Sequence, residues 1–227
     1  PTEGKRSGAY SSGSAYDVHP YILMNWNDDY ESLSTLAHEL GHTMHSFYSN
    51  ANQPFSKADY ATFVAEIAST INETLLNNYM VKNAKSNEEK LFLLGSYLDL
   101  LRTTIFRQTS FAEFELEIHK RVEEGKPLTG DDLCNIYYDI VKKYYGHDAG
   151  HCVVDPYIQY EWSYIPHFMG YTYYVFQYST SLIYATAFAE KIVNEGTPAV
   201  DNFYKILNGG GSKYAVELIK DAGIDPL

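Results

Sequence analysis

A His-Glu-x-x-His pentapeptide, formed by His38, Glu39 and His42, constrains this chain more than any other stretch of its sequence. On a helix, residues four apart lie on one face, so both imidazoles can bind a single Zn²⁺ while the glutamate reaches a metal-bound water. The pattern therefore predicts a helix that carries two ligands of a catalytic zinc site. A chance match on a surface helix is the alternative.

We expect this helix to run from about Tyr30 to Phe47, because Asn, Asp and Asp at 27–29 are capping candidates. At 100° per residue, one side is apolar and the nearly opposite side carries histidines. We predict that the apolar stripe packs against the chain and that the histidine side faces a cleft. Gly41 lowers helix stability by about 1 kcal/mol relative to Ala, which close approach of another backbone would explain. The stripe consists of Leu33, Leu36, Leu40, Met44 and Phe47, and the histidine side of His38, His42 and His45.

Two histidines leave a catalytic zinc site short of one protein ligand, because three protein ligands and an open position for water are typical. A third histidine in the metzincin pattern is excluded, since His45 stands where that pattern needs Gly and Tyr48 where it needs His. We interpret His45 as a cleft or core histidine, because a fourth protein ligand would close the site.

A carboxylate from a following helix is the other source of a third ligand. Glu66 lies on a helix that we expect from about Lys57 to Lys82, which can pack back after one loop. Asp59 and Glu73 are the other carboxylates in range.

The charge and composition of the chain exclude some classes of binding partner. The 227 residues carry a formal net charge of −12, which argues against nucleic acid and anionic membrane surfaces, because both attract positively charged proteins. We expect neither a transmembrane helix nor a signal peptide. Cys134 and Cys152 have no framework spacing, so we expect reduced thiols without a metal role in a cytoplasmic protein.

The remaining sequence is predicted to be mainly helical, in one catalytic domain over 1–227. A loop or short hairpin over 1–17 precedes a strand over 19–25, which Pro20 places at a sheet edge. The fold class is therefore mainly α, a helical zincin domain with a small N-terminal β-hairpin or edge strand. Further helices are expected over 57–82, 86–122, 129–145, 170–193, 197–207 and 213–222, and mostly loop over 146–168.

Several segments together resemble a known family. His-Glu-Leu-Gly-His-Thr-Met-His at 38–45, combined with Phe-Val-Ala-Glu-Ile-Ala-Ser-Thr at 63–70, is similar to the thimet-oligopeptidase-like metallopeptidases, and most similar to the bacterial oligoendopeptidase F branch. Gly-Ala-Tyr-Ser-Ser-Gly at 8–13, His-Pro-Tyr-Ile-Leu-Met-Asn at 19–25 and Glu-Trp-Ser-Tyr-Ile-Pro-His-Phe at 161–168 resemble that branch too. The resemblance spans nearly the whole chain.

The resemblance implies a role for each acidic residue near the pentapeptide. Glu39 is the general base, which takes a proton from water as that water attacks the scissile carbonyl. Glu73 corresponds to a carboxylate that holds a ligand histidine, since a metal-bound imidazole usually donates its other N–H to such a group. The implied ligands of one Zn²⁺ per chain are His38, His42 and Glu66.

Residues far along the chain are implied to contact the substrate. In the family, a histidine and tyrosines of the corresponding segment contact substrate carbonyls, where hydroxyl and N–H donors can stabilise an oxyanion. This implies catalytic roles for His167 and Tyr174, and substrate contacts for Tyr171 and Tyr173. Phe176 stands where we expect a tyrosine, so that hydroxyl is replaced by another tyrosine or its effect is weakened.

The strand over 19–25 gains a role under the same resemblance. An exposed edge strand can pair with an extended peptide through main-chain hydrogen bonds that do not depend on sequence. In the family a peptide lies along such an edge, beside the active-site helix. Substrate contacts are therefore implied for His19, and for Gly8, which would allow close backbone approach.

We thus predict a zinc-dependent endopeptidase that hydrolyses short, unstructured oligopeptides. We expect the chain to be the C-terminal catalytic part of a longer enzyme, because the family's large helical N-terminal lobe has no counterpart in it. A catalytically silent peptide-binding fragment and a zinc carboxypeptidase stay open as alternatives. The carboxypeptidase needs a cation for the substrate's C-terminus, from Arg102, Arg107 or Arg121. Another divalent metal in place of zinc also stays open.

Overall fold

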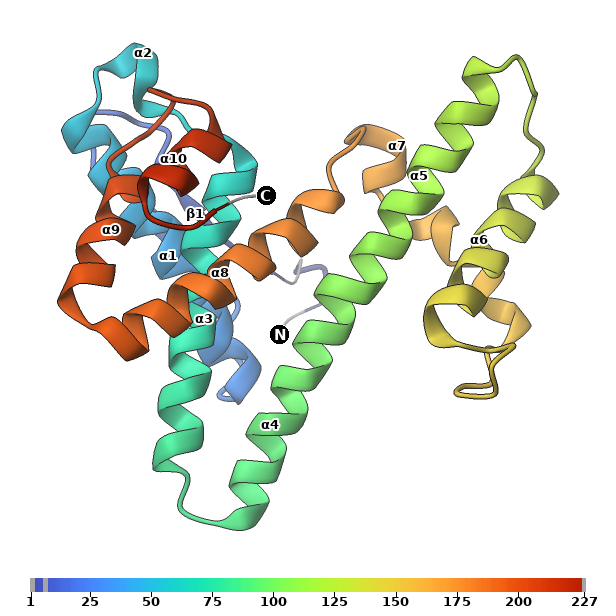
Figure 1. The fold of residues 1–227 in the computed structure, drawn as a ribbon, viewed down its shortest axis with the longest axis horizontal. Helices are drawn as coiled ribbons and strands as arrows, with labels where there is room; N and C mark the ends of the chain where they lie inside the picture. The colour runs from blue at the N-terminus through green and yellow to red at the C-terminus, as the bar shows by residue number, and fades with distance from the viewer. Residues whose placement is uncertain (1–2, 6–7, 226–227) are drawn as a thin grey trace. The chain divides into compact units, whose positions relative to one another are not determined.

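The computed structural model describes residues 3–5 and 8–225 and is mainly α-helical (Figure 1). Its two short strands form an antiparallel hairpin, which confirms the predicted fold class. The first elements are β1 (Ala9–Ser12), β2 (Tyr21–Met24), α1 (Tyr30–Asn52), α2 (Phe55–Ala58), α3 (Thr62–Asn83) and α4 (Asn87–Leu101). They are followed by the π-helical segment η1 (Arg102–Phe106), α5 (Arg107–Glu123), α6 (Gly130–Tyr145), the 3₁₀-helix η2 (Pro156–Tyr164), α7 (His167–Gly170), α8 (Phe176–Glu195), α9 (Thr197–Leu207) and α10 (Ala215–Asp221).

The chain forms two compact units. The first unit contains the chain up to Tyr97 and from Thr180 onward, and the second runs from Leu98 to Ser179. Each unit buries a cluster of apolar side chains of its own. In the first unit these are Val64, Ile67, Ile71, Ala185, Phe188, Ile206, Ile219 and Ala222.

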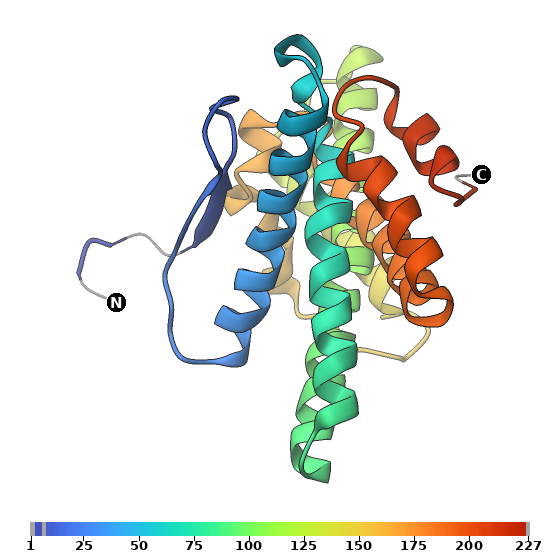
Figure 2. The same ribbon diagram turned by 90° about the vertical axis from the view of Figure 1, so that its left-hand side faces the viewer.

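Helices α1 and α3 lie side by side in the first unit, and the hairpin lies along another side of α1 (Figure 2). Gly41 allows the two helices to come close. A Cβ atom at this position would lie 2.5 Å from both Ala68 O and Ser69 Cα, which are backbone atoms of α3. The prediction that another backbone approaches Gly41 is therefore confirmed.

The orientation of α1 differs from the prediction. The apolar stripe is not the packed side, since Leu40, Met44 and Phe47 are 44%, 40% and 52% exposed. Small side chains on the histidine side let α3 approach closely, and a close helix pair gains dispersion contacts along its whole length. The buried residues of α1 are therefore small or polar: Ser32, Glu39, Gly41, His45, Ser46 and Ser49.

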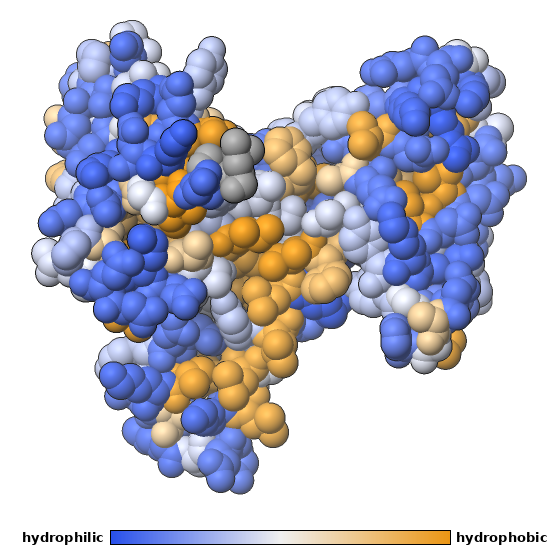
Figure 3. All heavy atoms as spheres, viewed as in Figure 1, coloured by the Kyte–Doolittle hydropathy of each residue, from blue (hydrophilic) through white to orange (hydrophobic). Residues whose placement is uncertain are grey.

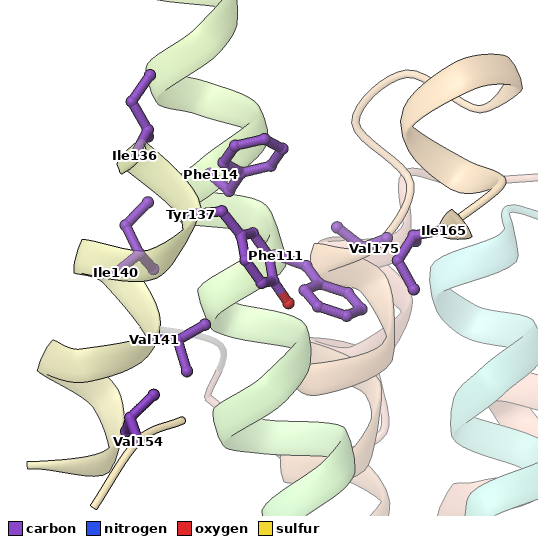
Figure 4. Packing of buried hydrophobic residues seen from close by; sticks show 9 residues of the cluster. All are labelled: Phe111, Phe114, Ile136, Tyr137, Ile140, Val141, Val154, Ile165 and Val175. Carbon is purple, nitrogen blue, oxygen red and sulfur yellow. The ribbon is translucent and has the colours of Figure 1, made fainter. Parts of the chain in front are cut away.

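The second unit is organised around α5 and α6. Phe111 and Phe114 of α5 lie against the fully buried ring of Tyr137 on α6, at ring-centroid distances of 6.1 Å and 5.2 Å (Figure 4). Helix α6 matches the range expected over 129–145: a capping box of Thr129 and Asp132 starts it, and it ends at Gly146 in a left-handed conformation. The whole buried cluster is Phe111, Phe114, Ile136, Tyr137, Ile140, Val141, Val154, Ile165 and Val175.

Other helix boundaries depart from the sequence prediction. The helix expected over 86–122 is helical throughout, but Arg102–Phe106 is π-helical. Helix α8 begins at Phe176 rather than near Gly170, because a turn with Tyr173 at φ +55° separates it from α7. Helix α1 continues to Asn52, beyond the end expected near Phe47, and α2 follows.

Apolar side chains gather over α4 at the surface (Figure 3). Leu91 and Phe92, for example, are 73% and 58% exposed. Within the described residues, no helix combines the length and the apolar character needed to cross a membrane.

Candidate metal centre

Three predicted ligand atoms converge between α1 and α3. The Nε2 atoms of His38 and His42 lie 3.1 Å apart. Glu66 Oε2 lies 3.5 Å from the first of these nitrogens and 3.8 Å from the second. A tetrahedral Zn²⁺ with bonds of about 2.0–2.2 Å separates its ligand atoms by roughly 3.3–3.6 Å. The triangle therefore fits such an ion.

Glu73 contacts the back of one of these histidines. Its Oε1 lies 2.5 Å from His38 Nδ1, and its Oε2 accepts a hydrogen bond from the Ser34 hydroxyl at 3.3 Å. A proton on Nδ1 leaves the Nε2 lone pair directed at the metal position. Burial lowers the pKa of His38, but the hydrogen bond and the charge of Glu73 outweigh it, so the net pKa is raised. This contact is the one expected from the sequence.

Burial also shifts the pKa values of the other two candidate ligands. It lowers the pKa of His42 to about 4, with the charge of His38 as a second cause, so the His42 ring is neutral near pH 7 as a metal ligand must be. Burial also raises the pKa of Glu66, whose Oε2 accepts a hydrogen bond from the Ser69 hydroxyl at 3.2 Å. The third carboxylate in range, Asp59, is exposed and lies outside the cluster.

Glu39 lies beside the ligand triangle, with only 7% of its surface exposed. Burial raises the pKa of its carboxyl group, and a backbone hydrogen bond from Ser11 of β1 acts in the opposite direction. The Thr43 hydroxyl donates to Glu39 O at 2.9 Å and lies 2.8 Å from Ser11 Oγ, which fixes β1 on α1. A buried carboxyl group with a raised pKa suits a general base.

The hairpin residues predicted to contact substrate are both exposed. His19 lies just before β2, with its ring against Tyr21 at 4.5 Å. Gly8 O accepts hydrogen bonds from the backbone and side-chain amides of Asn25, at 3.2 Å and 2.9 Å. A Cβ on Gly8 would meet no described atom within 4 Å, and its φ of +114° is a conformation that favours glycine.

The second unit brings Tyr171 and Tyr174 to His167, while the Tyr173 ring lies 5.0 Å from the ring of His119 instead. The His167 ring stacks on Tyr174 at 5.6 Å and lies 5.9 Å from Tyr171. The Tyr178 hydroxyl is 3.3 Å from His167 Nε2, a contact the sequence reasoning missed. The four-residue spacing of Tyr174 and Tyr178 was the available signal. Thus the structure brings together the metal set within the first unit and the His167 set within the second.

His45 is a core residue, one of the two outcomes expected. It is fully buried and stacks on Tyr60 at 3.6 Å with an interplanar angle of 10°. Neither ring nitrogen has a hydrogen-bond partner among the described residues, and burial lowers the pKa of the ring to about 3. A neutral, unpaired imidazole in the core contributes packing rather than ligation.

The sequence of this chain matches a family of known peptidases. The pattern of peptidase family M3 matches residues 1–227. Oligopeptidase PepF of Bacillus subtilis strain 168 is 48% identical over 223 residues, 98% of this chain and 32% of that protein. An oligoendopeptidase F homolog of Lactococcus lactis subsp. lactis strain IL1403 is 46% identical over 222 residues, 98% of this chain and 36% of that protein.

A solved structure shows the same relationship. The crystal structure of oligoendopeptidase-F from Enterococcus faecium matches with a TM-score of 0.71 and 41% identity, over 86% of this chain and 34% of that one. The chain thus spans about a third of the length of the relatives it matches. Because the family pattern covers the full chain, the chain belongs to peptidase family M3.

Proposed function

We propose that this chain is the catalytic part of a zinc-dependent endopeptidase that hydrolyses short, unstructured oligopeptides. The observation that carries the proposal is the triangle of His38 Nε2, His42 Nε2 and Glu66 Oε2 with Glu39 beside it. Family membership and the names of the relatives support a peptidase of oligopeptides.

Each residue of the centre has a distinct part in the proposed mechanism. His38, His42 and Glu66 hold the metal, and Glu73 keeps the His38 ring in the orientation that binding requires. Bound zinc supplies a Lewis acid that polarises a carbonyl and lowers the pKa of water. The Glu39 carboxylate takes the proton of the attacking water and later delivers it to the leaving amine, for which its raised pKa is suited.

The proposal also assigns residues to the substrate. His167 and Tyr174 donate hydrogen bonds to the developing oxyanion, while Tyr171 and Tyr173 contact the peptide. The peptide pairs with a free edge of the hairpin, near His19 and Gly8. Because the sheet has two strands, each has one free edge, and β1 is the strand that hydrogen-bonds to Glu39.

The setting of the chain is part of the proposal. The catalytic domain covers residues 1–227, and the enzyme is cytoplasmic. A further N-terminal lobe of the same protein completes a deep substrate channel, and this channel restricts the size of the peptides that can enter. The share of the relatives' length that the chain covers, about a third, supports a longer protein.

Hydrolysis of a quenched fluorescent oligopeptide tests the proposal, in the 227-residue chain and in the full reading frame that contains it. Activity should disappear with a chelator, return with zinc, and fall on the order of 10²–10⁴-fold in Glu39→Gln. Glu31→Gln, an exposed glutamate in the first turn of the same helix, serves as the matched control. Chelator-insensitive hydrolysis that survives Glu39→Gln would sink the metal mechanism.

The same experiment distinguishes the alternatives. If metal analysis finds about one zinc per chain and neither polypeptide hydrolyses the peptide, a catalytically silent peptide-binding fragment is favoured. Cleavage restricted to the last residue of a defined peptide favours a carboxypeptidase. Against that reading, each candidate cation is paired with a carboxylate of its own unit: Arg102 with Asp99, Arg107 with Glu161 and Arg121 with Glu117.

A further inference from the structure

Glu115 is a buried carboxyl group for which the proposed mechanism has no use. It lies on α5 (Figure 1), is 2% exposed, and its Oε1 accepts a hydrogen bond from the backbone N–H of Tyr173 at 2.7 Å. His119, one helical turn later, places its ring 5.0 Å from the Tyr173 ring. A buried carboxyl group is costly unless it is hydrogen-bonded. Helix α5 therefore contacts Tyr173 at two points, the backbone and the ring.

Tyr173 adopts a backbone conformation that tyrosine disfavours. Its φ is +55°, and it occupies the third position of a turn closed by the hydrogen bond from Tyr174 N–H to Tyr171 O at 3.2 Å. Positive φ at that position defines a type II turn, where Gly or Asn is the usual residue. Such a conformation persists only where its surroundings impose it. The carboxyl group of Glu115 is a buried polar contact to the backbone of this residue.

The strained turn joins the two side chains to which we assign catalysis. Tyr171 N–H donates to His167 O at 2.9 Å, and the ring of Tyr174, the next residue after Tyr173, stacks on the ring of His167. We infer that Glu115 is a positioning residue: by holding Tyr173 at positive φ it sets the orientation of Tyr174 against His167. This inference rests on the proposed function for its effect on catalysis, but its structural part can be measured without any activity.

Selective isotope labelling gives the structural measurement. Thr172–Tyr173 is the only Thr-Tyr pair in the sequence, so ¹³C-carbonyl threonine with ¹⁵N-tyrosine yields a single amide signal. A charge-assisted hydrogen bond deshields that amide proton. We expect an upfield shift of the Tyr173 amide proton in Glu115→Gln, a larger one in Glu115→Ala, and a changed His167 imidazole signal in both. Glu113→Gln, a half-buried glutamate of α5 paired with Lys143, should leave these signals unchanged.

Kinetics measure the catalytic consequence. In the full reading frame, Glu115→Ala should lower kcat on the order of 10–100-fold with little change in KM, because misplaced catalytic donors weaken the transition state more than substrate binding. Zinc content should stay at the wild-type level. Glu115→Gln should lower kcat less than Glu115→Ala does, since the amide oxygen of glutamine still accepts a hydrogen bond. Tyr173→Gly should restore the wild-type His167 imidazole signal in the Glu115→Ala background, because glycine adopts positive φ without an imposed contact.

The outcomes separate the inference from the proposed function. An unchanged Tyr173 amide signal in Glu115→Ala overturns the inference, as does a changed signal with wild-type kcat. A double variant whose His167 imidazole signal stays as in Glu115→Ala overturns it too. If the wild-type protein shows no chelator-sensitive hydrolysis, the proposed function fails, and the Tyr173 and His167 signals still decide whether Glu115 positions the turn. Should Glu115→Ala fail to fold, as judged by circular dichroism, Glu115→Gln alone must show the amide shift and the fall in kcat.

Discussion

Replacing Gly41 by alanine perturbs stability and metal binding together. The new Cβ would lie 2.5 Å from Ala68 O and Ser69 Cα, while ordinary contact begins at 3.4 Å, so the helices must separate by 3.4 − 2.5 = 0.9 Å at this point. Overpacking of this kind lowers stability by about 1–3 kcal/mol. We expect a loss near the upper end of that range, because the clash is with backbone atoms and no side chain can rotate away. Alanine also has a higher helix propensity than glycine, which stabilises the helix by about 1 kcal/mol. We expect a net loss of about 2 kcal/mol.

The same separation should weaken zinc binding, because Glu66 lies on α3 while both histidine ligands lie on α1. Thermal unfolding should show a Tm lower by about 4–8 °C for a chain of this size, and a metal competition assay should show a raised Kd. Gly95→Ala is the matched control: this glycine of α4 has open space around its Cβ, so the variant should gain up to about 1 kcal/mol. A Gly41→Ala variant as stable as Gly95→Ala, with unchanged zinc affinity, would refute the reasoning.

Two other predictions concern the polar residues near the centre. Glu73→Gln should lower zinc affinity on the order of 10–100-fold while Glu31→Gln does not, in the same competition assay, because Glu73 orients His38. His45 has a folded-state pKa lowered from 6.5 to about 3 by burial, so the unfolded state binds its proton first and stability is lost as the pH falls below 6.5. Between pH 7 and pH 5, the free energy of unfolding measured in urea should fall by about 2 kcal/mol less in His45→Phe than in the wild type. An equal fall in both proteins would contradict this assignment.

Part of the candidate site was predictable because it depends on one helix alone. His38 and His42 are four residues apart, so they face the same way whatever the helix packs against. The residues alone left Asp59, Glu66 and Glu73 open as the third ligand. The family resemblance singled out Glu66 and assigned Glu73 to a ligand histidine, and both carboxylates lie close to His38 in the structure. Capping signals likewise located the start of α1 at Tyr30 and of α6 next to Thr129.

The orientation of α1 could not be predicted from its hydrophobic pattern. Periodicity identifies two sides of a helix but not which side another helix will approach. Here the deciding factor is residue size, since Gly41 and Ser49 are buried while Met44 and Phe47 remain exposed. The Gly in the pentapeptide was the one sign of this in the sequence.

The turn before α8 was missed for a different reason. Nothing in the composition of residues 170–175 excludes a helix, and tyrosine at positive φ is not a residue that signals a turn. The conformation depends on Glu115, which lies far away in the sequence. His167 and Tyr178 stand on either side of this turn in the sequence, so their contact depends on the same conformation.

The interrupted sequence of the first unit affects the order in which the protein can fold during synthesis. Ile67 and Ile71 of α3 pack on residues of α8, α9 and α10, which the ribosome makes more than a hundred residues later. The second unit, by contrast, is one uninterrupted segment and has all its core partners once Ser179 has emerged. Nascent α1 and α3 therefore carry His38, His42 and Glu66 for some time before the core of their unit is complete, and a cell short of chaperones should lose this unit first.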